Sequence, residues 1–204
     1  MGRQLIQRLL QRGYTVRALV RRGSEGKLPS GAVAVFGNAL DGQSYAGQIA
    51  PATTFVQLVG VAHPSPAKAA QFRDVDLPSG LGAIAAAKSA GILHFVYLSV
   101  AHPAPVMKAY ITVRSECERA LCDAGLDATI LRPWYVLGPG HRWPYLLIPI
   151  YKIAELLPAT RNGAQRLGLV TLAQMTNALL AAVETPVRGQ RIVTVPEIRA
   201  LRIH

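Results

Sequence analysis

Apolar and polar residues follow one another along this chain in two alternating patterns, one with helical and one with extended spacing. In residues 3–12 (RQLIQRLLQR) the leucines and the isoleucine recur at helical spacing, which predicts an amphipathic helix that stops at Gly13. The next run, YTVRALV at residues 14–20, is apolar and contains β-branched residues, as strands do. The first predicted element is therefore a helix and the second a strand.

The alternation continues through the rest of the chain. Further strands are predicted at residues 32–38, 53–60, 92–100, 127–140 (running into a Pro/Gly-rich turn), 167–172 and 190–195. Helices or helical turns are predicted at residues 41–49, 67–90, 107–124, 143–158 and 173–184. Strands that alternate with helices are typical of a parallel sheet covered by helices, so we expect an α/β fold in a single domain, residues 1–204.

The composition fits one well-packed domain. The chain has 204 residues, and 50% of them are hydrophobic, which argues against disorder. Its net charge of +11 invites a nucleic-acid or anionic-membrane interpretation. The basic residues are scattered, however, and aromatic residues make up only 6% of the chain, so we expect a phosphorylated small molecule rather than nucleic acid as the partner.

Three features bear on where the protein acts. Cys117 and Cys122 share one predicted helix at a spacing that suits neither a disulfide nor a metal site, so we expect reduced thiols and no bound metal. The basic first helix lacks the apolar stretch of a secretory signal, which predicts a cytoplasmic protein. Residues 143–158 are apolar but interrupted by charges and prolines, which argues against a transmembrane span and leaves peripheral membrane contact open.

Six segments have the sequence character of one family, in the family's order and spacing. They are GRQLIQRLLQRGYTVRALVRR, VFGNALD, FVQLVGVAHP, AAAKSAGILHFVYLSV, AYITVRSECE and ILRPWYVLGPG, and they cover most of residues 2–140. Through these segments the chain resembles the extended and atypical short-chain dehydrogenase/reductases, a group that includes NmrA-like proteins, sugar-nucleotide epimerases and an accessory subunit of respiratory complex I. The resemblance implies a Rossmann-type, doubly wound parallel sheet that binds NAD(P).

The resemblance also implies an element that precedes the first helix. In the family a first strand leads into Gly-x-x-Gly-x-x-Gly, and the last of these glycines begins the first helix. Gly2 matches that last glycine, while the strand and the first two glycines are absent. The sheet would then lack a central strand, and the pyrophosphate would lack most of its backbone N–H cradle. We therefore expect an N-terminally truncated chain or a start codon placed too far downstream; the alternative is that Gly2 simply follows Met1.

Two pairs of residues are implied to bind the nucleotide end of the cofactor. Arg21 and Arg22 follow the second family strand, where relatives that select NAD tend to place an acidic residue. A guanidinium suits the 2′-phosphate of NADP, so we expect NADP in preference to NAD, the alternative being a solvated basic loop. Asn38 and Ala39 match a position that the resemblance places at the adenine, and Asn38 could equally form an Asx turn.

Two further stretches are expected beside the cofactor. Val59, Gly60 and Val61 end a strand that should pass under the ribose, where a small residue lets the backbone approach closely. Pro133, preceded by Arg132, matches the exit of a later strand that borders the nicotinamide in the family. Both assignments follow from the fold rather than from side-chain chemistry.

Catalysis is implied by Tyr110 and Arg114. The family's Tyr-x-x-x-Lys motif places both side chains on one helix face, where the ammonium lowers the pKa of the phenol, the tyrosine relays a proton during hydride transfer and the lysine also binds the nicotinamide ribose. In AYITVR the tyrosine is in place and an arginine of different geometry stands in the lysine position. Ser99 matches the region of the family's third catalytic residue. The alternative for Tyr110 is a helix residue packed against the sheet.

Histidine and aromatic residues are candidates for the substrate pocket. His63 and His102 follow neighbouring strands at the edge where open α/β sheets bind ligands, and each could line the pocket, donate a proton or belong to a proline-containing turn. An aromatic wall contributed by residues 134–204, or alternatively the packing of a C-terminal helix, is expected to involve Trp134, Tyr135 and Trp143.

These observations lead to two functional hypotheses. The first is an NAD(P)-dependent oxidoreductase or an epimerase/dehydratase-like enzyme that acts on an unidentified small molecule. The second is a non-catalytic NAD(P)-binding regulator or assembly subunit, which the arginine at position 114 and the poorly matched serine region favour.

Overall fold

The computed structural model describes residues 1–138, 162–163 and 165–201. The predicted helix at residues 143–158 lies outside this part of the chain. In chain order the helices and strands are α1 (Gly2–Gln11), β1 (Arg17–Val20), β2 (Val33–Phe36), α2 (Gln43–Ala46), β3 (Thr54–Gln57), α3 (Ala69–Gln71), α4 (Leu77–Ser89), β4 (His94–Leu98), α5 (Lys108–Asp123), β5 (Ala128–Leu131), β6 (Tyr135–Leu137), β7 (Leu169–Thr171), α8 (Leu172–Glu184), β8 (Gln190–Val193) and α9 (Val195–Ala200).

Parallel strands form the centre of the molecule. Four of them lie in the order β3-β4-β5-β8, with Phe55 opposite Phe95 and Val96 opposite Thr129. β1 and β2 form a second parallel pair, and β6 and β7 a third. The predicted α/β fold with a parallel sheet is thus confirmed, although the paired strands fall into three groups rather than one.

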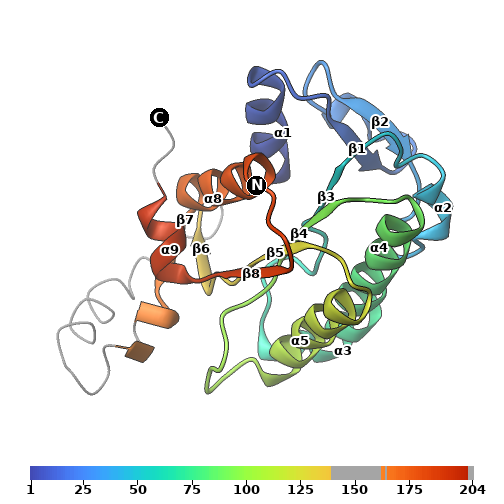
Figure 1. The fold of residues 1–204 in the computed structure, drawn as a ribbon. Coiled ribbons are helices and arrows are strands. Elements are labelled where there is room, and N and C mark those ends of the chain that lie inside the picture. The colour runs from blue at the N-terminus through green and yellow to red at the C-terminus, as the bar shows by residue number, and fades with distance from the viewer. Residues whose placement is uncertain (139–161, 164, 202–204) are drawn as a thin grey trace.

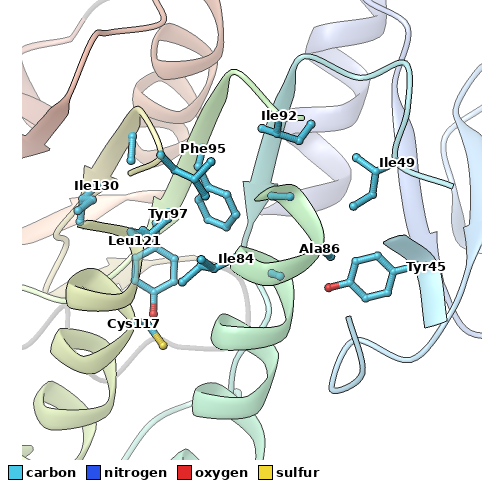
Figure 2. Close-up of a cluster of buried hydrophobic side chains, with 14 of the residues drawn as sticks. Tyr45, Ile49, Ile84, Ala86, Ile92, Phe95, Tyr97, Cys117, Leu121 and Ile130 are labelled. Atoms are coloured by element: carbon cyan, nitrogen blue, oxygen red, sulfur yellow. The ribbon is translucent and has the colours of Figure 1, made fainter. Parts of the chain in front are cut away.

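Helices cover both faces of the strands, and each face has its own hydrophobic core. Figure 1 shows α4 and α5 on one side of β3, β4 and β5, with α1 and α8 on the other. The core under α4 and α5 is shown in Figure 2, where Phe95 and Tyr97 of β4 point toward Ile84, Cys117 and Leu121. The rings of Phe55 and Phe95 stack there with their centroids 5.2 Å apart.

The core on the opposite face is built from α1 and α8. Leu5 and Leu9 of α1 are buried against Leu179 and Leu180 of α8. These two leucines of α1 lie one helical turn apart, which confirms the amphipathic pattern of the first segment.

Three local differences from the pattern have physical causes. The single helix predicted over residues 67–90 is broken before α4 by a π-helical turn at Phe72–Asp76, and Pro78 lies in the first turn of α4, where a missing N–H is harmless. The strand predicted at residues 127–140 is interrupted near Pro133, which cannot donate to a ladder, and continues as β6 in another sheet. Helix α9 was not predicted, although Thr194 and Glu197 form its capping box.

No helix in the described part of the chain combines the length and the apolar character that a membrane crossing requires.

Candidate functional site

The predicted site residues come from loops and helices at the carboxyl ends of the parallel strands. Arg21 and Arg22 follow β1, Val59 to Val61 follow β3, Ser99 follows β4, and Pro133 follows β5. In open α/β sheets this edge is where ligands bind. The topology therefore brings the sequence-predicted positions to one edge, while the individual contacts decide what each of them can do.

Arg114 lies at the centre of a buried polar network on α5. Its Nη2 donates a hydrogen bond to Asp76 Oδ1 at 2.6 Å, and its Nη1 donates to the carbonyl oxygen of Leu98 at 2.9 Å. The two ionic side chains are 4% and 0% exposed. Asp76 Oδ2 also accepts from the backbone N–H of Val61 at 3.0 Å. Arg114 thus ties α5 to the ends of β3 and β4.

Gly60 lies directly against this ion pair. A β-carbon at position 60 would lie 2.2 Å from Arg114 Nη2 and 2.7 Å from Asp76 Oδ1. Both distances are far below van der Waals contact, so a side chain at position 60 would force the Arg114–Asp76 pair to shift. We expected a small residue here to admit the cofactor; in the structure the space beside Gly60 holds Arg114 and Asp76.

Tyr110 lies one turn before Arg114 on the same helix face. The Arg114 Cζ atom is 5.1 Å from the centroid of the Tyr110 ring, and that ring packs against Phe72 with centroids 4.8 Å apart. Burial raises the pKa of the Tyr110 phenol, and the nearby Arg114 guanidinium only partly opposes the rise. The phenol is therefore held in its neutral form, whereas the family motif implies a lowered pKa.

Ser99 contacts a second polar cluster, centred on Glu118. Ser99 Oγ donates to Glu118 Oε1, and Arg132 donates to the same carboxylate through Nε, at 3.0 Å, and through Nη2. His102 Nε2 lies 3.5 Å from Glu118 Oε2. The cluster thus joins the ends of β4 and β5 to α5.

Asp76 and Glu118 are not among the site residues that the sequence predicts. Glu118 could have been found, because it follows Arg114 by four residues and so completes the helix face that starts at Tyr110. Asp76 carries no such signal, because its partner is 38 positions away in sequence.

The nucleotide end of the site is more open. The first turn of α1 contains no acidic side chain, and Met1 makes no capping hydrogen bond with its side chain, so its N–H groups suit an anion. A β-carbon at Gly2 would lie 3.8 Å from Leu58, which is ordinary contact. Arg21 and Arg22 are exposed, and the Arg22 Cζ atom lies over the Phe36 ring, 5.5 Å from its centroid.

Asn38, for which the sequence allowed an adenine contact or an Asx turn, forms the Asx turn. Its Oδ1 accepts from the backbone N–H of Leu40 at 3.1 Å, and its own N–H donates to Ser44 Oγ at 2.9 Å. Asn38 is exposed and the neighbouring Ala39 is half-buried. A contact between Asn38 and the adenine stays a prediction.

The substrate-side residues are only partly within the described chain. His63 is exposed and has a left-handed backbone with φ of 50°, which is typical of a turn. The rings of Trp134 and Tyr135 pack edge to face at 5.7 Å, and Pro133 is buried. Trp143 lies outside the described residues.

The sequence as a whole identifies the class of protein. A sequence profile described as NAD(P)H-binding matches residues 1–142. This match spans well over half of the chain, so the protein belongs to the NAD(P)H-binding family. A search of curated proteins found no match.

Solved structures share the fold at low sequence identity. The enzyme WbmH from Bordetella bronchiseptica, in complex with NAD+, has a TM-score of 0.68 at 19% identity and covers 95% of this chain and 71% of its own. The UDP-N-acetylglucosamine 4-epimerase from Bacillus cereus has a TM-score of 0.67 at 15% identity, and the alignment covers 95% of this chain and 74% of the epimerase. A short-chain dehydrogenase/reductase superfamily protein from Agrobacterium tumefaciens, with bound NAD, has a TM-score of 0.67 at 18% identity. The alignment covers 95% of this chain and 74% of that protein. The chain therefore has the Rossmann-type fold of these enzymes, as the sequence resemblance implied.

Proposed function

We propose that the protein binds NADP(H) along the carboxyl edge of its sheet and transfers hydride to or from a small carbonyl or hydroxyl compound. The observation that most supports this is the placement of Tyr110 and Arg114 on one face of α5, with the guanidinium 5.1 Å from the phenol ring centroid. When bound, the cofactor supplies or accepts the hydride. Sugar nucleotides head the substrate candidates, because one structure with this fold is a UDP-N-acetylglucosamine 4-epimerase.

Tyr110 would hold the proton that this reaction needs. Its raised pKa keeps the hydroxyl protonated at neutral pH, so the phenol can donate its proton to a carbonyl oxygen that gains negative charge. The phenolate that remains would be stabilised by the fixed positive charge of Arg114. In the reverse direction the same phenolate would accept a proton from a hydroxyl group.

The preference for NADP rests on the side chains after β1. Arg21 and Arg22 are both exposed there, where a guanidinium can bind a 2′-phosphate. The first turn of α1 would face the pyrophosphate with its backbone N–H groups. Asn38, Ala39 and the Val59–Val61 turn would line the rest of the dinucleotide.

Residues 134–204 would supply the substrate side of the site. In the described part of this segment, Arg166 Nε donates to the carbonyl oxygen of Pro103 at 3.1 Å, next to His102. Trp134 and Tyr135 add aromatic surface at the end of β5. We also propose a cytoplasmic location, which the free cysteines Cys117 and Cys122 support.

A specific observation favours the second hypothesis, a non-catalytic cofactor-binding subunit. Arg114 is buried, and both of its terminal guanidinium nitrogens donate hydrogen bonds to protein groups, Nη2 to Asp76 and Nη1 to the Leu98 carbonyl oxygen. Ser99 is committed to Glu118 in the same way. These contacts leave Tyr110 as the main candidate for chemistry.

Binding measurements test the cofactor assignment. Arg21→Ala and Arg22→Ala should each weaken NADPH binding by about tenfold and NADH binding much less, because only NADPH has the 2′-phosphate. Arg188→Ala removes an exposed arginine between α8 and β8 and is the matched control. Equal losses for both cofactors, or losses in the control, would contradict the NADP preference.

Turnover measurements separate the two hypotheses. The protein is given NADPH and a panel of carbonyl compounds and UDP-sugars, and NADPH oxidation and product epimers are measured. Enzyme function predicts turnover that Tyr110→Phe abolishes while the Kd for NADPH stays the same. Tight NADPH binding with no turnover, which Arg114→Lys does not restore, would establish the non-catalytic function instead.

A further inference from the structure

Asp76 is a buried carboxylate with no part in the hydride and proton transfer proposed above. It is the last residue of the π-helical turn before α4, and its side chain is 0% exposed. Both of its oxygens have partners, since Oδ1 accepts from Arg114 Nη2 at 2.6 Å and Oδ2 accepts from the backbone N–H of Val61 at 3.0 Å. Burying a charge is costly unless the charge is paired, so the function of Asp76 must lie in these contacts.

The partner of Asp76 also contacts two tyrosines. The Arg114 Cζ atom is 5.1 Å from the centroid of the Tyr110 ring, and Arg114 Nη1 donates to the Tyr97 hydroxyl at 3.4 Å. A nearby positive charge favours the phenolate form of a tyrosine. An ion pair has no net charge, so a guanidinium bonded to a carboxylate favours the phenolate less than an unpaired cation would.

Other charged side chains around Tyr110 are paired elsewhere or solvated. Helix α5 packs against α4, the π-helical turn and the short 3-10 turn at Pro66–Lys68. Glu118, two turns past Tyr110, is paired with Arg132. The Lys68 ammonium donates to a backbone carbonyl oxygen at 2.6 Å. Water screens the charges that reach solvent on these elements, among them Arg73, Asp74, Lys88, Lys108, Glu116 and Arg119.

The ionisation of the buried groups agrees with this geometry. Burial raises the pKa of the Tyr110 phenol, the Arg114 charge opposes the rise, and the negative charge of Asp76 adds to it. Burial also raises the pKa of Tyr97 and of the Cys117 thiol beside it, so both of these groups are neutral. Asp76 and Arg114 therefore act on Tyr110 with opposite signs.

We propose that Asp76 is a positioning residue that sets the acid strength of Tyr110, because it fixes the Arg114 guanidinium and neutralises its charge. This inference rests on the proposed function of Tyr110. In carbonyl reduction the carbon gains a hydride from the bound cofactor and the oxygen gains the Tyr110 proton, after which the phenolate takes a proton from water. In alcohol oxidation the phenolate must first accept the hydroxyl proton. With Asp76 in place, Tyr110 donates a proton near neutral pH and accepts one only in alkaline solution.

The test measures the ionisation of Tyr110 directly. The protein is labelled with 3-fluorotyrosine, whose phenol ionises at a lower pH than that of tyrosine, and ¹⁹F NMR follows the Tyr110 signal, assigned with Tyr110→Phe, against pH. Asp76→Asn should lower the titration midpoint by about one pH unit or more, because it leaves the Arg114 charge uncompensated. Asp74→Asn makes the same charge change at an exposed position two residues earlier and should leave the midpoint unchanged.

Two further variants separate a charge effect from loosened packing. Arg114→Met keeps the carboxylate and removes the cation, so the titration midpoint of Tyr110 should rise. Asp76→Leu/Arg114→Met removes both charges and should have a lower midpoint than Arg114→Met. Loosened packing would instead expose Tyr110 to water and lower the midpoint in every variant.

Turnover gives a second measurement. In the alcohol-to-carbonyl direction with NADP⁺, kcat/KM should reach its plateau at a lower pH in Asp76→Asn than in the unmodified protein. The NMR titration needs neither cofactor nor turnover, so an inactive protein would contradict the proposed function while the titration still decides this inference.

Two results would overturn the proposal. The first is a Tyr110 midpoint that Asp76→Asn leaves unchanged or raises, or that Asp74→Asn lowers equally. The second is the same midpoint in Arg114→Met and in Asp76→Leu/Arg114→Met. If Asp76→Asn does not fold, this second comparison decides, because apolar side chains that replace both members of a buried ion pair are usually tolerated.

Discussion

Arg114 Nη2 lies 2.6 Å from Asp76 Oδ1, and both side chains are almost completely buried. The pair connects α5 to the turn that precedes α4, and through Leu98 and Val61 it also holds the ends of β4 and β3. Arg114 and Asp76 therefore hold together the carboxyl ends of two neighbouring strands and the helix α5.

The first prediction concerns this ion pair. Arg114→Met should lower the free energy of unfolding by about 3–5 kcal/mol, because it leaves the Asp76 carboxylate buried without its partner. The double variant Asp76→Leu/Arg114→Met should be more stable than the sum of the two single losses implies. Urea denaturation of the four proteins measures this coupling, and additive losses would show that the two groups do not interact.

The second prediction concerns the close contact between α2 and α4. A β-carbon at Gly42 would lie 2.1 Å from the carbonyl oxygen of Gly82, which is backbone and cannot move aside easily. Gly42→Ala should therefore cost about 1–3 kcal/mol of unfolding free energy. Gly47→Ala, five residues on, meets nothing within 4 Å and should change stability by less than about 1 kcal/mol. Similar thermal stabilities for the two variants would refute the contact.

The third prediction concerns acid stability. Burial lowers the pKa of His94, which the charge of Asp127 only partly opposes. The folded protein thus binds fewer protons than the unfolded chain below the ordinary histidine pKa of about 6.5. Stability should fall as the pH drops through that value, by at most about 1.4 kcal/mol per pH unit for one group. His94→Gln should make the free energy of unfolding depend less steeply on pH between about pH 6.5 and 5, as measured by denaturation at several pH values. An unchanged slope would show that other groups cause the pH dependence.

The fourth prediction separates structure from catalysis at Ser99. Because Ser99 Oγ donates to the charged Glu118, Ser99→Ala should lower the free energy of unfolding by about 1.5–3 kcal/mol. Glu118→Gln should weaken the Arg132 contacts and cost a similar amount. If Ser99→Ala leaves stability unchanged while turnover is lost, the serine acts on substrate rather than on Glu118.

The fifth prediction concerns the thiols. Cys122 is exposed and Cys117 is fully buried, and burial also raises the pKa of the Cys117 thiol. An aromatic disulfide reagent should therefore label one cysteine rapidly in the native protein and the second only on unfolding. Two rapid labelling events would show that the core around Tyr97 in Figure 2 opens readily.

Local patterns predicted the elements well and the site contacts less well. The leucine spacing of α1 and the apolar run of β4 arise from residues close in sequence, and both elements were predicted. The helix spacing likewise placed Tyr110 and Arg114 on one face. The partner of each functional side chain was harder to predict, because a hydrogen bond between Arg114 and Asp76 spans 38 positions and no local pattern encodes it.

The sequence by itself determined the family, through the segments that match it. It determined the α/β class and the order of most of the helices and strands, because periodicity and turn residues act over a few neighbouring positions. It also placed Gly2 at the start of the first helix. Only the tertiary structure decided that Gly60 lies against the Arg114–Asp76 pair, that Ser99 is bonded to Glu118, and that residues of β1 and β3 line a common cavity. These relationships depend on how distant segments pack, and burial then determines which groups must be paired.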